Sequence, residues 1–182
     1  KYNTRWEKRF GVSAEMISVI YNGVDTDIFS PGDKKNTNVP TVVSIARIDP
    51  IKDIITLIEA TEIVVQEIPD VKVIVYGSVS VEEYYDECVK KVEELGLGEN
   101  FILAGHTNDV PSAYLMGDIV AASSISEAFP YSVVEAMMCG KPVVSTDVGG
   151  IAEALGDCGI LVTPRVPAEL AEVIIKLLND PE

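Results

Sequence analysis

Positively charged side chains are scarce in this chain. Its 182 residues include 14 Lys and Arg against 29 Asp and Glu, which gives a formal net charge of −15 with a single His. DNA, RNA and anionic membrane surfaces attract proteins through clustered positive charge, so this balance argues against long-range attraction to any of them. A local basic site remains open, and cations gathered at one place would stand out against so acidic a background.

Cysteine is also rare, and long apolar runs are absent. Cys88, Cys139 and Cys158 are an odd number, lie far apart and form no Cys-x-x-Cys pair, which predicts reduced, mostly buried thiols. No apolar run reaches the roughly 18 to 20 residues that cross a bilayer, and the first residues lack a signal-peptide pattern. We expect a cytoplasmic protein without an integral membrane segment. The start at Lys1 and the end just past a predicted helix suggest a piece of a longer protein.

Short β-branched runs alternate with helical patterns, and the 47% hydrophobic content is enough for a sizeable core in one domain. This alternation is typical of parallel βαβ units and predicts an α/β fold with a doubly wound sheet. Strands are expected at 17–21, 41–46, 71–76, 101–104, 118–122, 142–145 and 160–162. Helical spacing of apolar residues predicts helices near 54–65, 84–95 and 170–178, and an amphipathic helix with packed rings at Tyr2, Trp6 and Phe10. Residues 30–40 are expected to form an exposed loop.

Two glutamates eight residues apart mark a candidate ligand site. Glu127 is expected in the loop after a buried strand, and Glu135 about one turn inside an apolar helix that Pro130 begins, since proline suits a first helical position. Ligands bind at the carboxyl ends of parallel strands, where a helix N-terminus offers free N–H groups to phosphate. The apolar neighbours of Glu135 favour a buried, paired role, whereas Glu127 could also be an ordinary loop carboxylate.

Arg47 and Lys52 follow the strand at 41–46 and precede a predicted helix. Arginine offers a planar fork for phosphate, and lysine adds a point charge beside the positive end of the helix. Together with the two glutamates, these cations suit a sugar nucleotide. The alternative is that Arg47 forms a surface ion pair with Asp49 or Asp53 while Lys52 is solvated.

The motifs resemble, in order and over nearly the whole chain, the C-terminal donor-binding domain of retaining GT-B glycosyltransferases of family 4. The matching segments are IYNGVD at 20–25, ARIDPIKD at 46–53, the Glu-x7-Glu motif at 127–135, EAMMCGKPVV at 135–144 and TDVGGIAE at 146–153. Segments 52–58, 76–77, 124–127 and 129–131 resemble more narrowly the subgroup that contains the Pel exopolysaccharide glycosyltransferase.

The resemblance implies a Rossmann-like domain, the C-terminal half of a GT-B fold. It implies retaining, metal-independent hexosyl transfer from a UDP-sugar, or next a GDP-sugar, to a glycan or lipid-linked acceptor in polysaccharide biosynthesis, with no cofactor. Residues 1–29 would form an interdomain helix and linker strand, and residues 30–182 the nucleotide-sugar-binding domain. A missing N-terminal domain of the same protein would hold the acceptor and make any peripheral contact with the inner membrane face. No nucleic-acid partner is implied.

Family roles can be carried over residue by residue. Arg47 and Lys52 match the cations that stabilise the leaving diphosphate, and Glu127 matches the glutamate near the donor sugar, so these three are the catalytic candidates. Glu135 matches the glutamate that accepts from the ribose hydroxyls. The other substrate-binding candidates are Phe129, Pro130, Tyr131 and Ser132 at the sugar and distal phosphate, Gly77 on the donor side, and His106 and Thr107 near the base. Ala128 departs from the glycine that the family has there. No metal ligand is expected, and no Asp-x-Asp motif occurs where the other large glycosyltransferase fold would need one.

Several alternatives stay open from the residues themselves. His106, the only histidine, is better explained as a structural donor than as a general base. Gly149 and Gly150 fit either close approach to the ligand or a tight strand-to-helix turn. A sugar-nucleotide epimerase and a non-catalytic nucleotide-binding module are the rival functions, although the Glu-x7-Glu and Arg-x4-Lys spacings favour transfer. A dinucleotide dehydrogenase would need Gly-x-Gly-x-x-Gly after its first strand, where none occurs.

Overall fold

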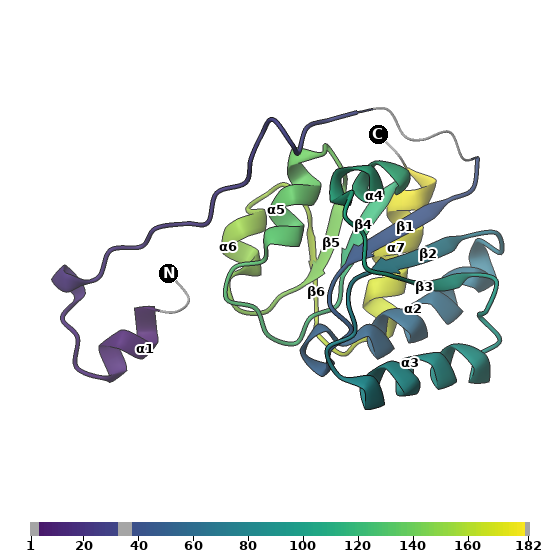
Figure 1. The fold of residues 1–182 in the computed structure, drawn as a ribbon, viewed down its shortest axis with the longest axis horizontal. Helices are drawn as coiled ribbons and strands as arrows, with labels where there is room; N and C mark the ends of the chain where they lie inside the picture. The colour runs from purple at the N-terminus through teal and green to yellow at the C-terminus, as the bar shows by residue number, and fades with distance from the viewer. Residues whose placement is uncertain (1–3, 33–37, 181–182) are drawn as a thin grey trace.

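A computed structural model of the chain describes residues 4–32 and 38–180, with side chains from residue 7 onward. The elements alternate between strand and helix after the N-terminal segment (Figure 1). In chain order they are α1 (Thr4–Arg9), the 3-10 helix η1 (Ala14–Met16), β1 (Thr41–Ile45), the 3-10 helix η2 (Pro50–Lys52), α2 (Ile54–Glu67), β2 (Lys72–Tyr76), α3 (Glu82–Glu94), β3 (Phe101–Gly105), α4 (Val110–Met116), β4 (Ile119–Ala122), α5 (Tyr131–Met138), β5 (Val143–Thr146), α6 (Ile151–Leu155), β6 (Ile160–Val162) and α7 (Pro167–Asn179).

The six strands form one parallel sheet in the order β3-β2-β1-β4-β5-β6. The chain moves outward from β1 through β2 to β3, returns through α4, and then continues outward from β4 to β6. The direction of winding therefore reverses between β1 and β4, and the sheet is doubly wound, as predicted. In such a sheet the reversal opens a crevice at the carboxyl ends of the two central strands.

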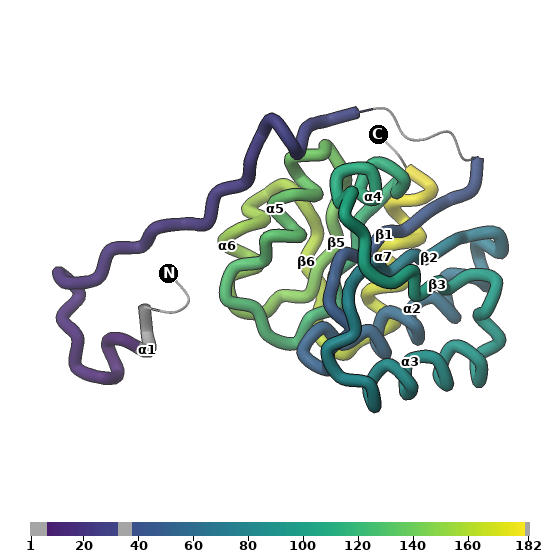
Figure 2. Tube along the Cα trace, viewed as in Figure 1, coloured from purple at the N-terminus to yellow at the C-terminus, as the bar shows by residue number. Residues whose placement is uncertain are grey.

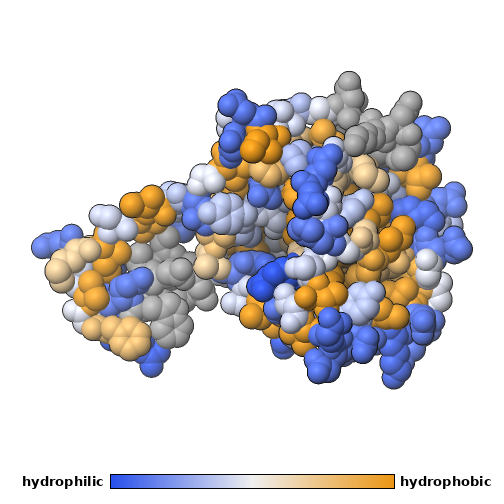
Figure 3. Space-filling model, viewed as in Figure 1, coloured by the Kyte–Doolittle hydropathy of each residue, from blue (hydrophilic) through white to orange (hydrophobic). Residues whose placement is uncertain are grey.

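Alternating strand residues face two separate cores, because successive side chains point to opposite faces of a strand. On β4, Ile119 and Ala121 join a large core with α2, α3 and α7, whereas Val120 joins a smaller core with α4, α5 and α6. Val144 and Val143 divide in the same way on β5. The outer surface of α3 is mainly hydrophilic (Figure 3). Helices thus cover both faces, and the buried, β-branched strands are those of a two-sided α/β sheet.

Residues 4–32 form an N-terminal arm. Its first part, with α1 and η1, extends away from the sheet (Figure 2), while Tyr21 and Phe29 contact the domain. The predicted strand at 17–21 is wrong, because this segment has no strand assignment and Ile20 is 90% exposed. A strand needs a neighbour for its backbone N–H and C=O groups, and the apolar pattern alone could not reveal that none is present here. The expected ring packing is also not observed at Phe10, which is 82% exposed. Tyr2 and the side chain of Trp6 lie outside the described residues.

The other predicted strands and helices are present, with ends shifted by a few residues at most, whereas α4 was not predicted. One shift concerns the candidate site, since α5 begins at Tyr131 and Pro130 is its N-cap residue rather than its first helical residue. Glu135 accordingly lies one turn inside the helix. Of the predicted loop at 30–40, residues 33–37 fall outside the described part, and Ser30, Pro31 and Gly32 are exposed.

Candidate functional site

A cavity of about 440 Å³ lies at the carboxyl ends of β1 and β4, where the winding of the sheet reverses. We call it the switch-point cavity. Its lining residues come from the ends of β1 and β2, the 3-10 helix η2, the loops after β3 and β4, and helices α4 and α5. They are Ile45, Ala46, Arg47, Lys52, Tyr76, Gly77, Ser78, His106, Thr107, Val110, Glu127, Phe129, Pro130, Tyr131, Ser132 and Glu135. Every site residue that the sequence analysis selected lies in this cavity, while their individual roles stay predictions.

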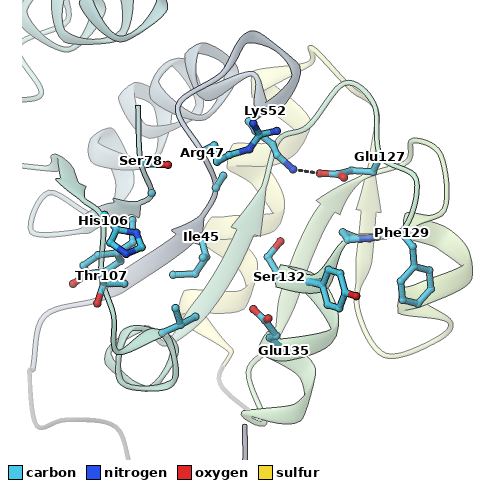
Figure 4. Close-up of a pocket in the computed structure, with 16 residues that line it drawn as sticks. Ile45, Arg47, Lys52, Ser78, His106, Thr107, Glu127, Phe129, Ser132 and Glu135 are labelled. Carbon is cyan, nitrogen blue, oxygen red and sulfur yellow. Dashed lines mark hydrogen bonds and ion pairs between the residues drawn. The ribbon is translucent and has the colours of Figure 1, made fainter. Parts of the chain in front are cut away.

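Lys52 and Glu127 form an ion pair at one side of the cavity (Figure 4). Both side chains are largely buried, at 18% and 14% exposure, so Lys52 is not solvated as the alternative expected. Behind the pair, the Ser124 hydroxyl donates to Oε1 of Glu127 at 3.0 Å, and the Thr146 hydroxyl donates to the Ser124 carbonyl. The carboxylate is therefore held from two directions, and it in turn fixes the ammonium at the cavity wall.

Arg47 has a looser environment than Lys52. Its side chain is 61% exposed, one guanidinium nitrogen lies 3.9 Å from Asp49 Oδ2, and the same nitrogen reaches the Ser80 hydroxyl at 3.4 Å. The alternative of an Arg47–Asp49 surface pair is thus present, but as a long contact that contributes little in water. Such a guanidinium can turn toward an anion in the cavity at small cost.

The β1 and β2 ends approach each other closely beside Arg47. A Cβ atom added to Gly77 would lie 1.9 Å from the Ala46 carbonyl oxygen, so only glycine fits at this point. The approach is reinforced because the backbone N–H of Ala46 donates to the Tyr76 carbonyl at 2.9 Å. Gly77 shapes the cavity by letting two strand ends meet, which is a structural basis for its place on the predicted donor side.

Glu135 and Ser132 project into the cavity from α5, and Glu135 lies across it from Lys52 (Figure 4). The hydroxyl of Tyr114 donates to Oε2 of Glu135 at 2.9 Å. Burial first, and then the neighbouring Glu135 carboxylate, raise the pKa of Tyr114 far above the usual value for a phenol, so Tyr114 stays protonated. Glu135 is half-buried and paired, as its apolar neighbours predicted.

The loop that carries Glu127 rests on the Gly149-Gly150 turn. A Cβ atom at Gly149 would lie 1.6 Å from the Glu127 carbonyl oxygen, and one at Gly150 would lie 2.1 Å from that of Ala128. The Gly150 N–H also donates to the Glu127 carbonyl at 3.2 Å. The tight-turn explanation of these glycines is therefore correct, and the turn also positions the loop. Ala128 has no positive φ, so its departure from glycine leaves the backbone unstrained.

His106 and Thr107 lie on the far side of the cavity from Glu127 (Figure 4). The His106 ring nitrogen Nε2 lies 3.1 Å from Oδ1 of Asn108, and the Thr107 hydroxyl accepts from the Asp109 N–H at 3.1 Å. A neutral amide does not strengthen a neighbouring imidazole as a base in the way that a carboxylate does. These contacts order the loop before α4, which agrees with the structural explanation of the histidine.

Sequence reasoning missed the residues that support the site from behind. Tyr114, Ser124 and Thr146 hold the two glutamates or the loop between them, yet none lies in the predicted motifs as a functional position. Tyr21, from the arm, is another such residue, because its hydroxyl bonds to Glu153 and its ring lies 5.7 Å from that of Phe129. Tyr21, Ser124 and Thr146 lie within matching segments, but sequence reasoning assigned them no role there, and Tyr114, one turn after Val110 on a short helix, equally fits plain core packing.

Two further properties concern the described residues alone. Within residues 4–32 and 38–180, no group of three or more His, Cys, Asp and Glu side chains could hold a metal ion. In that same part of the chain, no helix is long and apolar enough to cross a bilayer. The expectation of metal-independent chemistry stays a prediction, which chelation tests directly.

Known proteins resemble this chain in sequence and in fold. A D-inositol 3-phosphate glycosyltransferase of Mycobacterium sp. (strain KMS) is 35% identical over 177 residues, which cover 90% of this chain and 39% of that protein. HepE of Anabaena, solved with UDP and glucose, superposes with a TM-score of 0.84 at 31% identity over 95% of this chain and 50% of its own. Sucrose-phosphate synthase of Thermosynechococcus elongatus gives a TM-score of 0.87 at 25% identity, covering 99% of this chain and 48% of its own.

The similarity extends to a family model. Residues 25–182 match the model of glycosyl transferases group 1, which spans most of the chain and includes the whole sheet. The fold is Rossmann-like and its structural neighbours are GT-B glycosyltransferases, as the sequence predicts. The chain spans about two fifths to half the length of the relatives that it matches. It belongs to the family of glycosyl transferases group 1.

Proposed function

We propose that this chain is the donor-binding domain of a glycosyltransferase and that the switch-point cavity takes a nucleotide-diphospho-sugar, with UDP-sugars first and GDP-sugars next. The observation that carries the proposal is the separation of charge across one cavity, with Arg47 and Lys52 on one side and Glu135 on the other. Anionic phosphates suit the cations, and ribose hydroxyls suit the carboxylate. The similar fold of HepE, solved with UDP and with UDP-glucose, supports the choice of base.

The donor can be oriented in the cavity by charge alone. The diphosphate lies between the two cations and the start of α5, where the first backbone N–H groups of the helix have no partner in the helix. The ribose then reaches Glu135, and the base extends toward His106 and Thr107. The donor sugar falls near Glu127, which gives up part of its contact with Lys52 when the phosphate arrives.

The transfer step follows from this arrangement. The bond between the anomeric carbon and the phosphate oxygen breaks, and the oxygen keeps the electron pair as negative charge develops on the diphosphate. Arg47, Lys52 and the α5 amides stabilise that charge without a metal. The acceptor hydroxyl attacks from the same face and gives its proton to the departing phosphate oxygen, so the anomeric configuration is retained. His106 takes no part in this step.

The reaction of the whole protein goes beyond this chain. We propose that a preceding domain of the same protein holds the acceptor, and that the product belongs to polysaccharide biosynthesis, in line with the resemblance to the Pel subgroup. Holding the acceptor against the anomeric carbon can contribute about 7 to 11 kcal/mol to lowering the barrier. Without the facing domain that contribution is lost, so we expect the 182-residue chain to bind the donor and to transfer no sugar.

Calorimetry with UDP, GDP, ADP and NAD tests the binding proposal, and repeating it in EDTA tests independence from metals. We expect UDP to bind most tightly, with the same affinity in EDTA. Preferred binding of NAD would point to a dehydrogenase instead, and loss of UDP binding in EDTA would place a metal in the site. Acceptor-dependent transfer of labelled sugar by this chain alone, at the rate of the longer protein, would show that no second domain is needed.

A further inference from the structure

Tyr114 lies directly behind the switch-point cavity, on α4. Its side chain is fully buried at 0% exposure, and its hydroxyl contacts two groups of α5, Glu135 Oε2 at 2.9 Å and the Ser132 carbonyl at 3.1 Å. Both residues line the cavity, whereas Tyr114 does not. A buried phenol therefore contacts the ligand-facing helix from the side that no ligand reaches.

The single phenolic proton has a preferred acceptor. Ser132 lies in the first turn of α5, where its carbonyl is already an acceptor in the helical hydrogen-bond ladder. A carboxylate oxygen accepts a stronger, charge-assisted bond than a carbonyl. Because burial and the nearby carboxylate raise the pKa of Tyr114 far above its ordinary value, the phenol keeps its proton at neutral pH. Tyr114 is thus a permanent donor to Glu135.

The ring of Tyr114 is fixed as firmly as its hydroxyl. Phe29 from the N-terminal arm packs edge-on against it, with ring centroids 6.2 Å apart. Val110 lies one turn earlier on α4 and lines the cavity, so one face of this helix contacts both the cavity and the carboxylate. The hydroxyl cannot move without repacking the small core, which makes it a rigid anchor for a flexible glutamate.

We propose that Tyr114 is a positioning residue for ribose recognition: its hydroxyl holds one oxygen of Glu135 so that the carboxylate presents its other acceptor sites to the 2′ and 3′ hydroxyls of a nucleoside diphosphate. A carboxylate has about four lone-pair sites, so one bond to Tyr114 leaves enough for both ribose hydroxyls. Holding the side chain before the ligand arrives removes part of the entropy cost of binding. This inference rests on the proposed function, which places the ribose at Glu135.

The test compares UDP with 2′,3′-dideoxyuridine diphosphate by calorimetry on the wild type, Tyr114→Phe and Glu135→Gln. The wild type should prefer UDP. Tyr114→Phe should bind UDP about five- to tenfold more weakly, which corresponds to the loss of one hydrogen bond. Its affinity for the dideoxy analogue should equal that of the wild type. Glu135→Gln should remove more of the preference, and the double variant should lose less than the sum of the two single losses.

Tyr84→Phe is the matched control. Tyr84 is also a buried phenol, but its hydroxyl accepts from the Ile55 N–H at 3.2 Å on the opposite face of the sheet. Removing the Tyr84 hydroxyl removes a comparable buried hydrogen bond and leaves the residues that line the cavity unchanged. Both nucleotides should bind Tyr84→Phe as they bind the wild type, so any change seen only in Tyr114→Phe arises from the contact with Glu135.

The possible failures separate this inference from the proposed function. If Tyr114→Phe keeps the full preference while Glu135→Gln loses it, Tyr114 has no positioning role and the ribose site stands. If Tyr114→Phe weakens both nucleotides equally, its role is packing alone. If the wild type binds both nucleotides equally, the ribose assignment fails and this inference fails with it.

A second measurement needs no change at Tyr114. With tyrosine labelled by 13C at Cζ, the Tyr114 resonance should shift in ligand-free Glu135→Gln, because the phenol loses a charged acceptor. It should also shift when UDP is added to the wild type, and much less with the dideoxy analogue. If the chemical shift of this resonance changes neither with the substitution nor with UDP, the proposal is wrong. This measurement remains decisive even if Tyr114→Phe fails to fold.

Discussion

The two faces of the sheet differ in the helices that cover them. One face is covered by α2, α3 and α7, of 14, 13 and 13 residues, and the other by α4, α5 and α6, of 7, 8 and 5 residues. The large core lies under the long helices and the small core under the short ones. Both α-helices that contribute side chains to the switch-point cavity, α4 and α5, are short, and Lys52 reaches it from the three-residue helix η2 just before α2. We call the two sides the long-helix face and the ligand face.

The difference has a physical basis. Every helix leaves about four N–H groups unpaired at its start whatever its length, so a short helix gives a larger share of its backbone to binding and a smaller share to packing. Long amphipathic helices bury a continuous stripe instead. The molecule therefore places most of its stability on one face and its ligand contacts on the other. Each prediction below tests this division.

The largest expected effect comes from matched leucines on the two faces. Leu57 on α2 and Leu155 on α6 are both buried, at 0% and 1% exposure. Leu57→Ala should lower the free energy of unfolding by about 4 kcal/mol, and Leu155→Ala by about 2.5 kcal/mol. The second loss is smaller because the five-residue helix α6 can move into the space left by the shortened side chain more easily than a long helix can. Denaturant titration of both variants measures the difference, and equal losses would contradict the division between the faces.

The long-helix face is also the part of the fold that sequence predicts best. Residues such as Leu57 on α2 and Leu170 on α7 repeat at helical spacing over several turns, and both are fully buried as expected. Periodicity works there because each helix packs one continuous stripe on the sheet. At 17–21 the same reasoning failed, since whether an apolar stretch finds a partner strand depends on the rest of the chain and not on its own residues.

The ligand face was predicted in its motifs but not in its supports. Lys52 and Glu127 are 75 positions apart, and the sequence indicated both as ligand groups without revealing that they pair with each other. In the sequence Tyr114 looks like a core aromatic. Its ring does pack in the core, but its hydroxyl also donates to Glu135, which the packing pattern does not reveal. Contacts between elements distant in sequence are set by the fold, which no local pattern encodes.

The next effect concerns the Gly149 turn on the ligand face. Gly149 has φ +60 and an added Cβ would lie 1.6 Å from the Glu127 carbonyl oxygen, whereas Gly96 has φ +66 and nothing within 4 Å. Gly149→Ala should cost about 3 kcal/mol, from backbone strain plus overlap, and displace the Glu127 loop. Gly96→Ala should cost about 1 kcal/mol from strain alone. Thermal unfolding measures both costs.

Nucleotide binding adds a second readout to the two glycines. UDP affinity should fall in Gly149→Ala and stay unchanged in Gly96→Ala, since Gly96 lies at the end of α3 on the long-helix face. Calorimetry on the folded variants tests this directly. Unchanged affinity in Gly149→Ala would show that the Glu127 loop tolerates displacement and that the turn serves stability alone.

A smaller effect is expected from the cations of the cavity. Lys52→Ala should weaken UDP binding by about 1.5 to 3 kcal/mol, roughly ten- to a hundredfold, because a buried charge-assisted contact is lost. Arg47→Ala should lose less, since its side chain is 61% exposed and its bonds to phosphate are shared with water. Lys90→Ala is the control, as Lys90 forms an exposed pair with Glu94 on α3. Wild-type affinity in both cavity variants would place the phosphates elsewhere.

The smallest effect is a difference in thiol labelling between the faces. Cys88 lies in the large core and Cys139 in the small one, at 0% and 2% exposure, while Cys158 is exposed and provides an internal control. Burial raises the pKa of Cys88 to about 12 and also raises that of Cys139, so labelling of either at pH 8 requires opening of the structure. We expect Cys158 to react first, then Cys139, then Cys88.

Adding UDP separates local opening of the ligand face from opening of the whole domain. If the ligand face opens by itself and loses its nucleotide, UDP at ten times its dissociation constant should slow Cys139 labelling about elevenfold. UDP should slow the labelling of Cys88 only if the opening that exposes Cys88 also disrupts the cavity. The labelling rate of Cys158 should not change. Mass spectrometry of labelled peptides over time gives the three rates. If Cys139 and Cys88 are labelled at equal rates and UDP slows both equally, the two faces open as one unit. The faces would then differ in their helices and cores but not in how easily they open.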